Sequence, residues 1–295
     1  MPAEFTCPSC RAVTTGRYCV QCGEKQLESH DRSLRHYLGE ALEVLTHFDT
    51  KIIRSVGLLL SRPGFLSTEW LQGKRIRYVS PLRLFLLLNI VYYISLTALQ
   101  SSTVTALTRL EFNTFTTPLA VQLHGNDFYP AYAARQVAEK LRLQALDYAD
   151  LQQKYDATAA VLSKTLVFAL IPVIALLFRS LFIRRKVFFA DHLVIATHFW
   201  SFVLLLLGVL LPAMVLPLAW ISAVQGMSSA VLINDQVVSY VLQVVLAVYI
   251  FLMLRRAYLA SIWYSGLVAA FIAWSFFFIV WLYRFLLFEV TLAVI

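Results

Sequence analysis

Long apolar blocks alternate with short polar stretches along most of this chain. The first block begins at Pro81 and stays apolar to Leu99, about the 20 residues that a helix needs to cross a bilayer. Further blocks follow at residues 161–182, 193–221, 237–254 and 262–287. This pattern predicts an all-α integral membrane protein with about five transmembrane helices.

The polar segments suggest a division of the chain into further parts. Apolar side chains recur at helical spacing between Leu34 and Leu59, which predicts an amphipathic helix at the membrane interface or against the spans. Ser67 is expected to cap a short helix after it. The expected parts are a cysteine module with a linker (1–28), cytoplasmic amphipathic helices (29–80), the first span (81–100), an extracytoplasmic segment with a helix (101–160), and spans two to five (161–295).

Composition agrees with a membrane protein. Of the 295 residues, 59% are hydrophobic and 14% are charged, whereas a soluble domain has about 45–50% apolar and about 25% charged residues. The formal net charge of +8 is better explained by loop arginines that orient the spans than by nucleic-acid binding. We therefore expect membrane lipids, and not nucleic acid, as partners.

The four cysteines form two Cys-x-x-Cys pairs near the N-terminus, separated by eight residues. Two such pairs are typical of a tetrahedral structural zinc site, which would stabilise a module too short for its own core. Redox-active dithiols and disulfides are alternatives. Gly23, directly after the last cysteine, suits a turn with positive φ. The predicted zinc ligands are Cys7, Cys10, Cys19 and Cys22.

Lys and Arg are concentrated in alternate connections between the spans. The connection at 222–236 contains neither residue. By the positive-inside rule, the N-terminus is cytoplasmic and the C-terminus extracytoplasmic, and zinc thiolates also favour the reducing cytosol. Near one membrane face, these cations form a cationic belt that could bind the phosphate of an anionic phospholipid or another anion. Its members are Lys74, Arg75, Arg77, Arg184, Arg185, Lys186, Arg255 and Arg256.

Two further sets of polar residues are weaker site candidates. His36, Glu40, Glu43 and His47 share one helical face, where neighbouring pairs could bind a divalent metal with outside ligands, although a solvated face is the simpler interpretation. His36 and His47 are roughly 16 Å apart along a helix, too far to share one ion. The second set lies within or near the spans, where buried polar groups serve function or join helices. It comprises Asn89, Asp191, His198 and Gln243.

The order of these features resembles a known family. The cysteine ribbon is followed by LRHYLGEALEVLTHFDTKIIRSVGLLL, by RPGF and by GKRIRYVSPLRLF. This combination, over roughly residues 7 to 100, resembles a family of bacterial membrane proteins known only as a domain of unknown function. The resemblance implies zinc at the four cysteines and a location in the bacterial inner membrane. It implies no reaction and no substrate.

Three functional hypotheses remain. The first is a non-enzymatic adaptor or assembly protein whose cytosolic ribbon binds a protein partner or the chain's own cytoplasmic helices. The second is a transporter or lipid-handling protein that uses the cationic belt and the third span, which prolines interrupt. The third is a membrane enzyme acting on lipid, although the chain has no HExxH, GxSxG or Walker motif. The sequence leaves the activity, the partner and the oligomeric state open.

Overall fold

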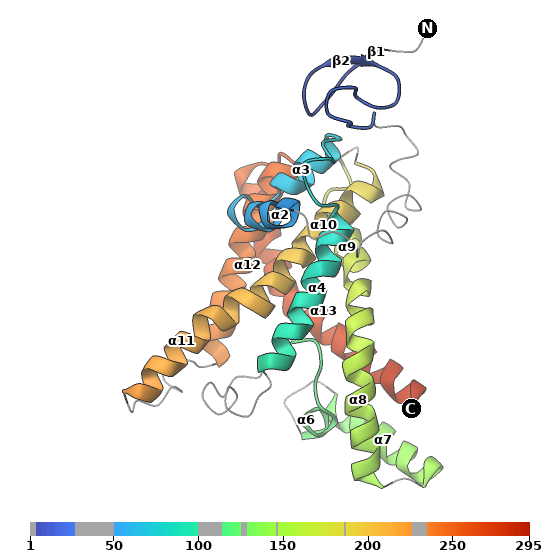
Figure 1. The fold of residues 1–295 in the computed structure, drawn as a ribbon. Helices are drawn as coiled ribbons and strands as arrows, with labels where there is room; N and C mark the ends of the chain where they lie inside the picture. Colours follow the sequence, from blue (N-terminus) through green and yellow to red (C-terminus); the bar gives the residue numbers. More distant parts are fainter. Residues whose placement is uncertain are drawn as a thin grey trace. The chain divides into compact units, whose positions relative to one another are not determined.

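A computed structural model of the chain describes residues 4–26, 50–99, 114–124, 129–145, 147–185, 187–225 and 235–295 (Figure 1). It divides into two compact units. The first comprises Met1–Leu110 and Ile171–Trp274, and the second Glu111–Leu170 and Ser275–Ile295. The predicted polar face at 36–47 lies outside the described residues.

The N-terminal module is a small ribbon in the first unit. Strand β1 (Glu4–Thr6) pairs antiparallel with β2 (Val13–Thr15), with Phe5 opposite Thr14. A single bridge joins Tyr18 to Lys25. So little regular structure cannot bury a core of useful size, which leaves the cysteines to stabilise the module.

Five helical segments are long and apolar enough to cross a membrane, which confirms the predicted fold class. They are Pro81–Leu99, Tyr148–Leu181, Phe189–Ile221, Gln236–Ala257 and Ile262–Val294. The second starts before the predicted boundary because the polar helix α8 (Tyr148–Leu166) runs through the 3-10 turn η2 (Val167–Ala169) into the apolar α9 (Leu170–Leu181). Hydropathy identifies only the apolar part of such a helix.

Prolines coincide with irregular turns in two of these segments. Pro172 follows η2, and Pro212 follows η3 (Leu206–Leu210), a π-helical turn between α10 (Phe189–Leu205) and α11 (Leu211–Val224). A proline cannot donate the backbone hydrogen bond to the residue four positions earlier, so a 3-10 or π turn nearby accommodates the loss. Pro217 lies inside α11.

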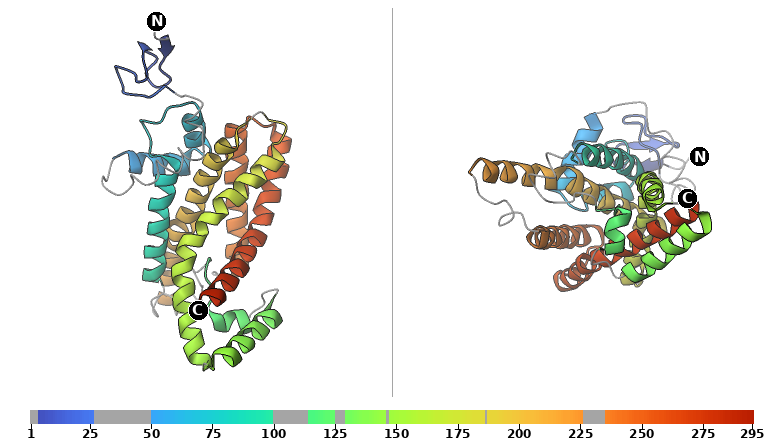
Figure 2. Two further views of the ribbon diagram at one scale, coloured as in Figure 1. Left: turned by 90° about the vertical axis from the view of Figure 1, so that its right-hand side faces the viewer. Right: turned by 90° about the horizontal axis from the view of Figure 1, so that it is seen from below.

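Helix α10 is central to the first unit. Every residue from His192 to Leu205 is buried, as expected for a helix that is apolar on all sides. Helix α4 (Pro81–Leu99) packs along α10 and η3 (Figures 1 and 2). A Cβ at Gly208 would lie 3.0 Å from the Cα of Tyr92, so this glycine permits the close approach of α4. The short helices α2 (Thr50–Ser61) and α3 (Phe65–Leu71) also contact α10, and α3 contacts α12 (Asp235–Ala257).

The second unit has a core of its own. Helices α6 (Leu119–His124), α7 (Pro130–Gln144) and α8 pack with the end of α13 (Ile262–Val294). The Gln122 amide donates to the Tyr155 hydroxyl (2.8 Å), and the Tyr129 hydroxyl donates to Gln122 (3.2 Å). Where the sequence predicts one helix within 101–160, the structure has α7 and α8, which are separated at Ala145, whose φ is 50°. Part of the 101–160 segment therefore folds into helices with a core of their own.

Candidate functional site

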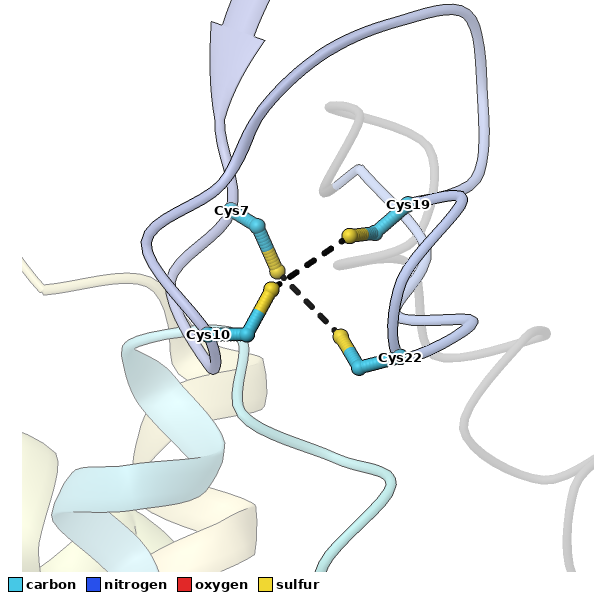
Figure 3. Close-up of side chains that lie close together, drawn as sticks. All are labelled: Cys7, Cys10, Cys19 and Cys22. Carbon is cyan, nitrogen blue, oxygen red and sulfur yellow. Dashed lines mark hydrogen bonds between the residues drawn. The ribbon is translucent and has the colours of Figure 1, made fainter.

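The ribbon brings the four predicted metal ligands together (Figure 3). Cys7 and Cys10 come from one loop, and Cys19 and Cys22 come from another. Their four sulfur atoms lie within 4.8 Å of one another. The Sγ atoms of Cys7 and Cys22 are 3.5 Å apart, as are those of Cys10 and Cys19, so sulfur contacts join the two loops.

This arrangement fits a metal bound by four thiolates. Zinc at about 2.3 Å from each sulfur of a tetrahedron needs sulfur atoms about 3.8 Å apart, which falls within the observed range. All four cysteines are free. All four sulfur atoms lie close enough to share one ion, which favours a single metal site over two separate dithiols. The cluster can therefore bind a metal ion, and its donor chemistry suits zinc.

The two ligand loops repeat one backbone geometry. The N–H of Arg11 donates to the carbonyl of Cys7 (2.9 Å), and the N–H of Gly23 donates to that of Cys19 (2.8 Å). Both Arg11 and Gly23, each directly after the second cysteine of its pair, have positive φ, 62° and 74°. The expected turn at Gly23 is confirmed, and Arg11 adopts the same conformation without being glycine, at a cost of order 1 kcal/mol.

Hydrogen bonding and burial give the cysteine thiols different pKa values. The backbone N–H of Cys22 is the main cause that lowers the pKa of Cys19 to about 7, against the effect of burial. The N–H of Glu24 would lower the pKa of Cys22, but burial and the other three thiols raise it to about 12. Since thiols bind zinc as thiolates, metal binding must displace protons from this cluster.

Glu24 connects the ribbon to another part of the first unit. Its carboxylate is buried and accepts hydrogen bonds from the Ser9 hydroxyl (2.5 Å) and from the backbone N–H groups of Arg75 (3.1 Å) and Ile76 (3.4 Å). Arg75 and Ile76 belong to the 73–80 loop, which leads into α4. The sequence analysis missed Glu24, because an acidic residue after a metal-binding turn has no recognisable spacing.

Charge complementarity adds to this contact. The 73–80 loop is basic, and the Arg77 guanidinium donates to the backbone carbonyl of Ser9 at 3.4 Å. Lys74 pairs with Glu69 on α3 at 2.7 Å. A carboxylate that accepts from successive backbone N–H groups within a cationic loop is held by charge-assisted hydrogen bonds. The ribbon is thus docked on the chain's own approach to the first span.

The Arg-Pro-Gly-Phe turn packs tightly against α12. Gly64 has a φ of 77°, and a Cβ there would lie only 2.9 Å from the backbone oxygen of Met253. The Arg256 guanidinium donates to the carbonyl of Pro63 (3.3 Å) and lies 6.0 Å from the ring centre of Phe65. This turn therefore requires glycine for both its conformation and its packing.

A serine–histidine pair joins α3 to α10. The Ser67 hydroxyl and His198 Nδ1 are 2.9 Å apart, and both side chains are buried. Within the described residues, His198 Nε2 has no hydrogen-bonding partner. The cap expected at Ser67 is wrong, because α3 begins at Phe65 with Gly64 before it. Burial of both groups makes this pair a helix contact and not an exposed nucleophile.

The remaining polar residues predicted near the spans lie at separate places in the structure. Asp191 accepts from the backbone N–H of Phe188 (3.2 Å) at the start of α10. Asn89 is buried on α4, and Gln243 is half-buried on α12. Asn89, His198 and Gln243 belong to three different helices, α4, α10 and α12. His192, adjacent to Asp191, bonds instead to the Tyr258 hydroxyl at 2.6 Å.

The members of the cationic belt differ in their surroundings. Lys74, Arg77 and Arg256 make the protein contacts described above, and Arg75 lies 4.8 Å from the ring centre of Trp70. Arg184 and Arg185 line a cavity. Arg255 is exposed, and Lys186 lies outside the described residues. Four of the eight belt residues therefore make contacts within the chain.

The fold and site define a class: a multi-pass α-helical membrane protein with an N-terminal four-cysteine metal-binding ribbon. A family model described as "Protein of unknown function (DUF3667)" matches residues 49–93. The matched stretch covers α2, α3, the 73–80 loop and most of α4, so it contains the loop on which the ribbon docks. This match and the cysteine cluster confirm the predicted resemblance to an uncharacterised family. No curated protein and no solved structure matches the chain.

Proposed function

We propose that this chain is a non-enzymatic membrane adaptor whose zinc-loaded ribbon is a docking module. The observation that carries the proposal is the buried Glu24 carboxylate, which binds the backbone of the 73–80 loop. Zinc fixes the ribbon in the shape that presents Glu24, and the loop acts as its ligand within the chain. A protein partner then competes with the 73–80 loop for the ribbon.

Glu24→Gln is expected to release the ribbon from the loop while the ribbon keeps its metal. The amide retains the size of the side chain but loses the charge, so the bonds from Arg75 and Ile76 weaken. A hydrogen bond to a charged group contributes about 1.5–3 kcal/mol, so backbone hydrogen exchange in the loop should accelerate roughly tenfold or more. The measurement is hydrogen–deuterium exchange of the purified full chain in detergent or nanodiscs.

Glu4→Gln is the matched control, since it removes an equal charge from an exposed position in β1 of the same ribbon. Loop exchange in this variant should equal that of the wild type. Equal exchange in wild type and Glu24→Gln would refute the docking.

The adaptor role has its own test in partner capture by the same variants. One protein species should co-purify with wild type and Glu4→Gln, increase with Glu24→Gln, where the ribbon is free, and be lost with Cys19→Ser. Absence of any protein that follows this order would reject the adaptor role, whatever the exchange result.

We further propose that zinc is the metal, and that the protein lies in a bacterial inner membrane with its N-terminus in the cytosol and its C-terminus outside. The support is the four-thiolate donor set, the resemblance, and the absence of Lys and Arg from 222–236. An alkaline phosphatase fused after Ile295 should be active in bacterial cells, and a fluorescent protein fused there should be dark. The reverse pattern would invert the topology.

A further inference from the structure

A cavity of about 370 Å³ lies where residues 181–185, at the end of α9, meet the start of α13. Ala260, Ser261 and Tyr264 complete its lining. All of these residues belong to the first unit. The cavity is separate from the metal cluster and from the ribbon contact.

Aromatic packing shapes the walls of this cavity. Phe182 is buried and stacks on Tyr258, with ring centres 4.0 Å apart and planes at 5°. Tyr264 meets the edge of Phe182 at 5.5 Å, and its hydroxyl donates to the backbone carbonyl of Leu181. These contacts tie the α9 end to the α13 start, so the cavity is held open by packed side chains.

The rim of the cavity is cationic. Arg184 and Arg185 are exposed, and among the described residues neither guanidinium has a hydrogen-bonding partner, in contrast to Arg77 and Arg256. Among the described residues that line the cavity, none carries a carboxylate. The α13 N-terminus, where the Ser261 hydroxyl accepts the Tyr264 N–H at 3.4 Å, adds the positive end of a long helix dipole. Guanidinium groups bind phosphate oxygens well.

Exposed apolar side chains belong to the cavity lining or are adjacent in sequence to its residues. Ile183, Leu259 and Trp263 are 75%, 79% and 89% exposed. Exposed aliphatic and tryptophan side chains at the ends of membrane helices are typical of the bilayer interface. A ligand in this cavity therefore meets two arginines as well as apolar side chains such as Phe182 and Ile183, which is the chemistry of a phospholipid.

We propose that this cavity binds the phosphate group of an anionic phospholipid through Arg184 and Arg185. The phosphate lies at the rim beside the start of α13, and the glycerol and upper acyl chains lie against Phe182 and Ile183. Free inorganic phosphate shares the recognised group but lacks the apolar part, so it binds more weakly.

Ser261 offers a test that preserves the fold. Aspartate and asparagine both cap helices about as well as serine, so Ser261→Asp adds a negative charge to the rim, and Ser261→Asn adds none. The delipidated full chain in an uncharged detergent is titrated with phosphatidylglycerol, phosphatidylcholine or inorganic phosphate and followed by native mass spectrometry. We expect phosphatidylglycerol to bind tightest, and to bind about tenfold or more weakly to Ser261→Asp and to Arg184→Gln/Arg185→Gln. Ser261→Asn, which adds similar bulk without the charge, should bind phosphatidylglycerol more tightly than Ser261→Asp does.

Arg135→Gln/Arg142→Gln removes the same charge at two exposed positions of α7 that do not line the cavity, and this variant should bind lipid like the wild type. Equal losses of lipid affinity in the two double variants would overturn the proposal. So would unchanged affinity in Arg184→Gln/Arg185→Gln or in Ser261→Asp. Displacement of lipid by equimolar inorganic phosphate would make the site one for free anions and would also overturn it. Zinc content and thermal stability of each variant verify that binding changes are not due to unfolding.

Discussion

Cys19→Ser is expected to abolish metal binding and to unfold the ribbon, with the spans left intact. Structural zinc commonly contributes about 10–16 kcal/mol of apparent binding free energy in small modules. Residues 4–26 have only two three-residue strands and no large core to replace it. Elemental analysis should give one zinc per wild-type chain and almost none for the variant. Backbone exchange across the ribbon and the 73–80 loop should rise together.

Thr15→Ser is a suitable control for this experiment, because Thr15 is exposed in β2 and lies outside the ligand set. It should retain zinc and normal exchange. Far-ultraviolet circular dichroism should be nearly unchanged in both variants, since helices dominate the signal. A Cys19→Ser protein with full zinc and a protected ribbon would contradict the assignment of the four cysteines as one metal site.

Gly64→Ala is expected to lower the free energy of unfolding by about 2–4 kcal/mol, a large effect for one methyl group. Part of the cost comes from the left-handed backbone at this position, where φ is 77°. The rest comes from the new Cβ, 2.9 Å from the oxygen and 3.1 Å from the Cα of Met253, which are backbone atoms at a buried position of α12 and cannot move alone. Thermal or denaturant unfolding in detergent measures the loss.

Gly57→Ala provides the opposite case within the same segment. A Cβ at Gly57, in the interior of α2, would meet nothing within 4 Å, and alanine favours a helix by about 1 kcal/mol over glycine. This variant should be as stable as the wild type or slightly more so. If the two alanine variants had equal stability, the tight contact between the Arg-Pro-Gly-Phe turn and α12 would be wrong.

The chain's patterns predicted the elements that depend on local sequence. The length of each apolar block is set by the bilayer, so five spans could be inferred from hydropathy. The metal cluster could be inferred because its ligands lie within 16 residues of one another, from Cys7 to Cys22. Pro81 also starts α4 as expected for a proline in the first turn of a helix.

The contacts between distant residues could not be predicted in this way. Ser67 reads locally as a helix cap, but its partner is His198, 131 residues later. Glu24 reads as an ordinary surface acid, but it is buried by Arg75 and Ile76, about 50 positions on. No single-sequence pattern encodes such pairings, because each depends on how the helices pack. For η3, the sequence likewise predicted only that prolines interrupt the third span, and not the π-helical turn itself.

The ribbon contact and the α3 contact differ in the order in which their residues are synthesised. Every residue that joins the ribbon to the 73–80 loop is translated before Pro81, where the first span begins. Gly64 and Ser67, in contrast, pack on Met253 and His198, which leave the ribosome much later. Domains form from the N-terminus onward during translation. The ribbon and its loop can thus assemble on a nascent chain, and α3 completes its packing only after the fourth span has been made.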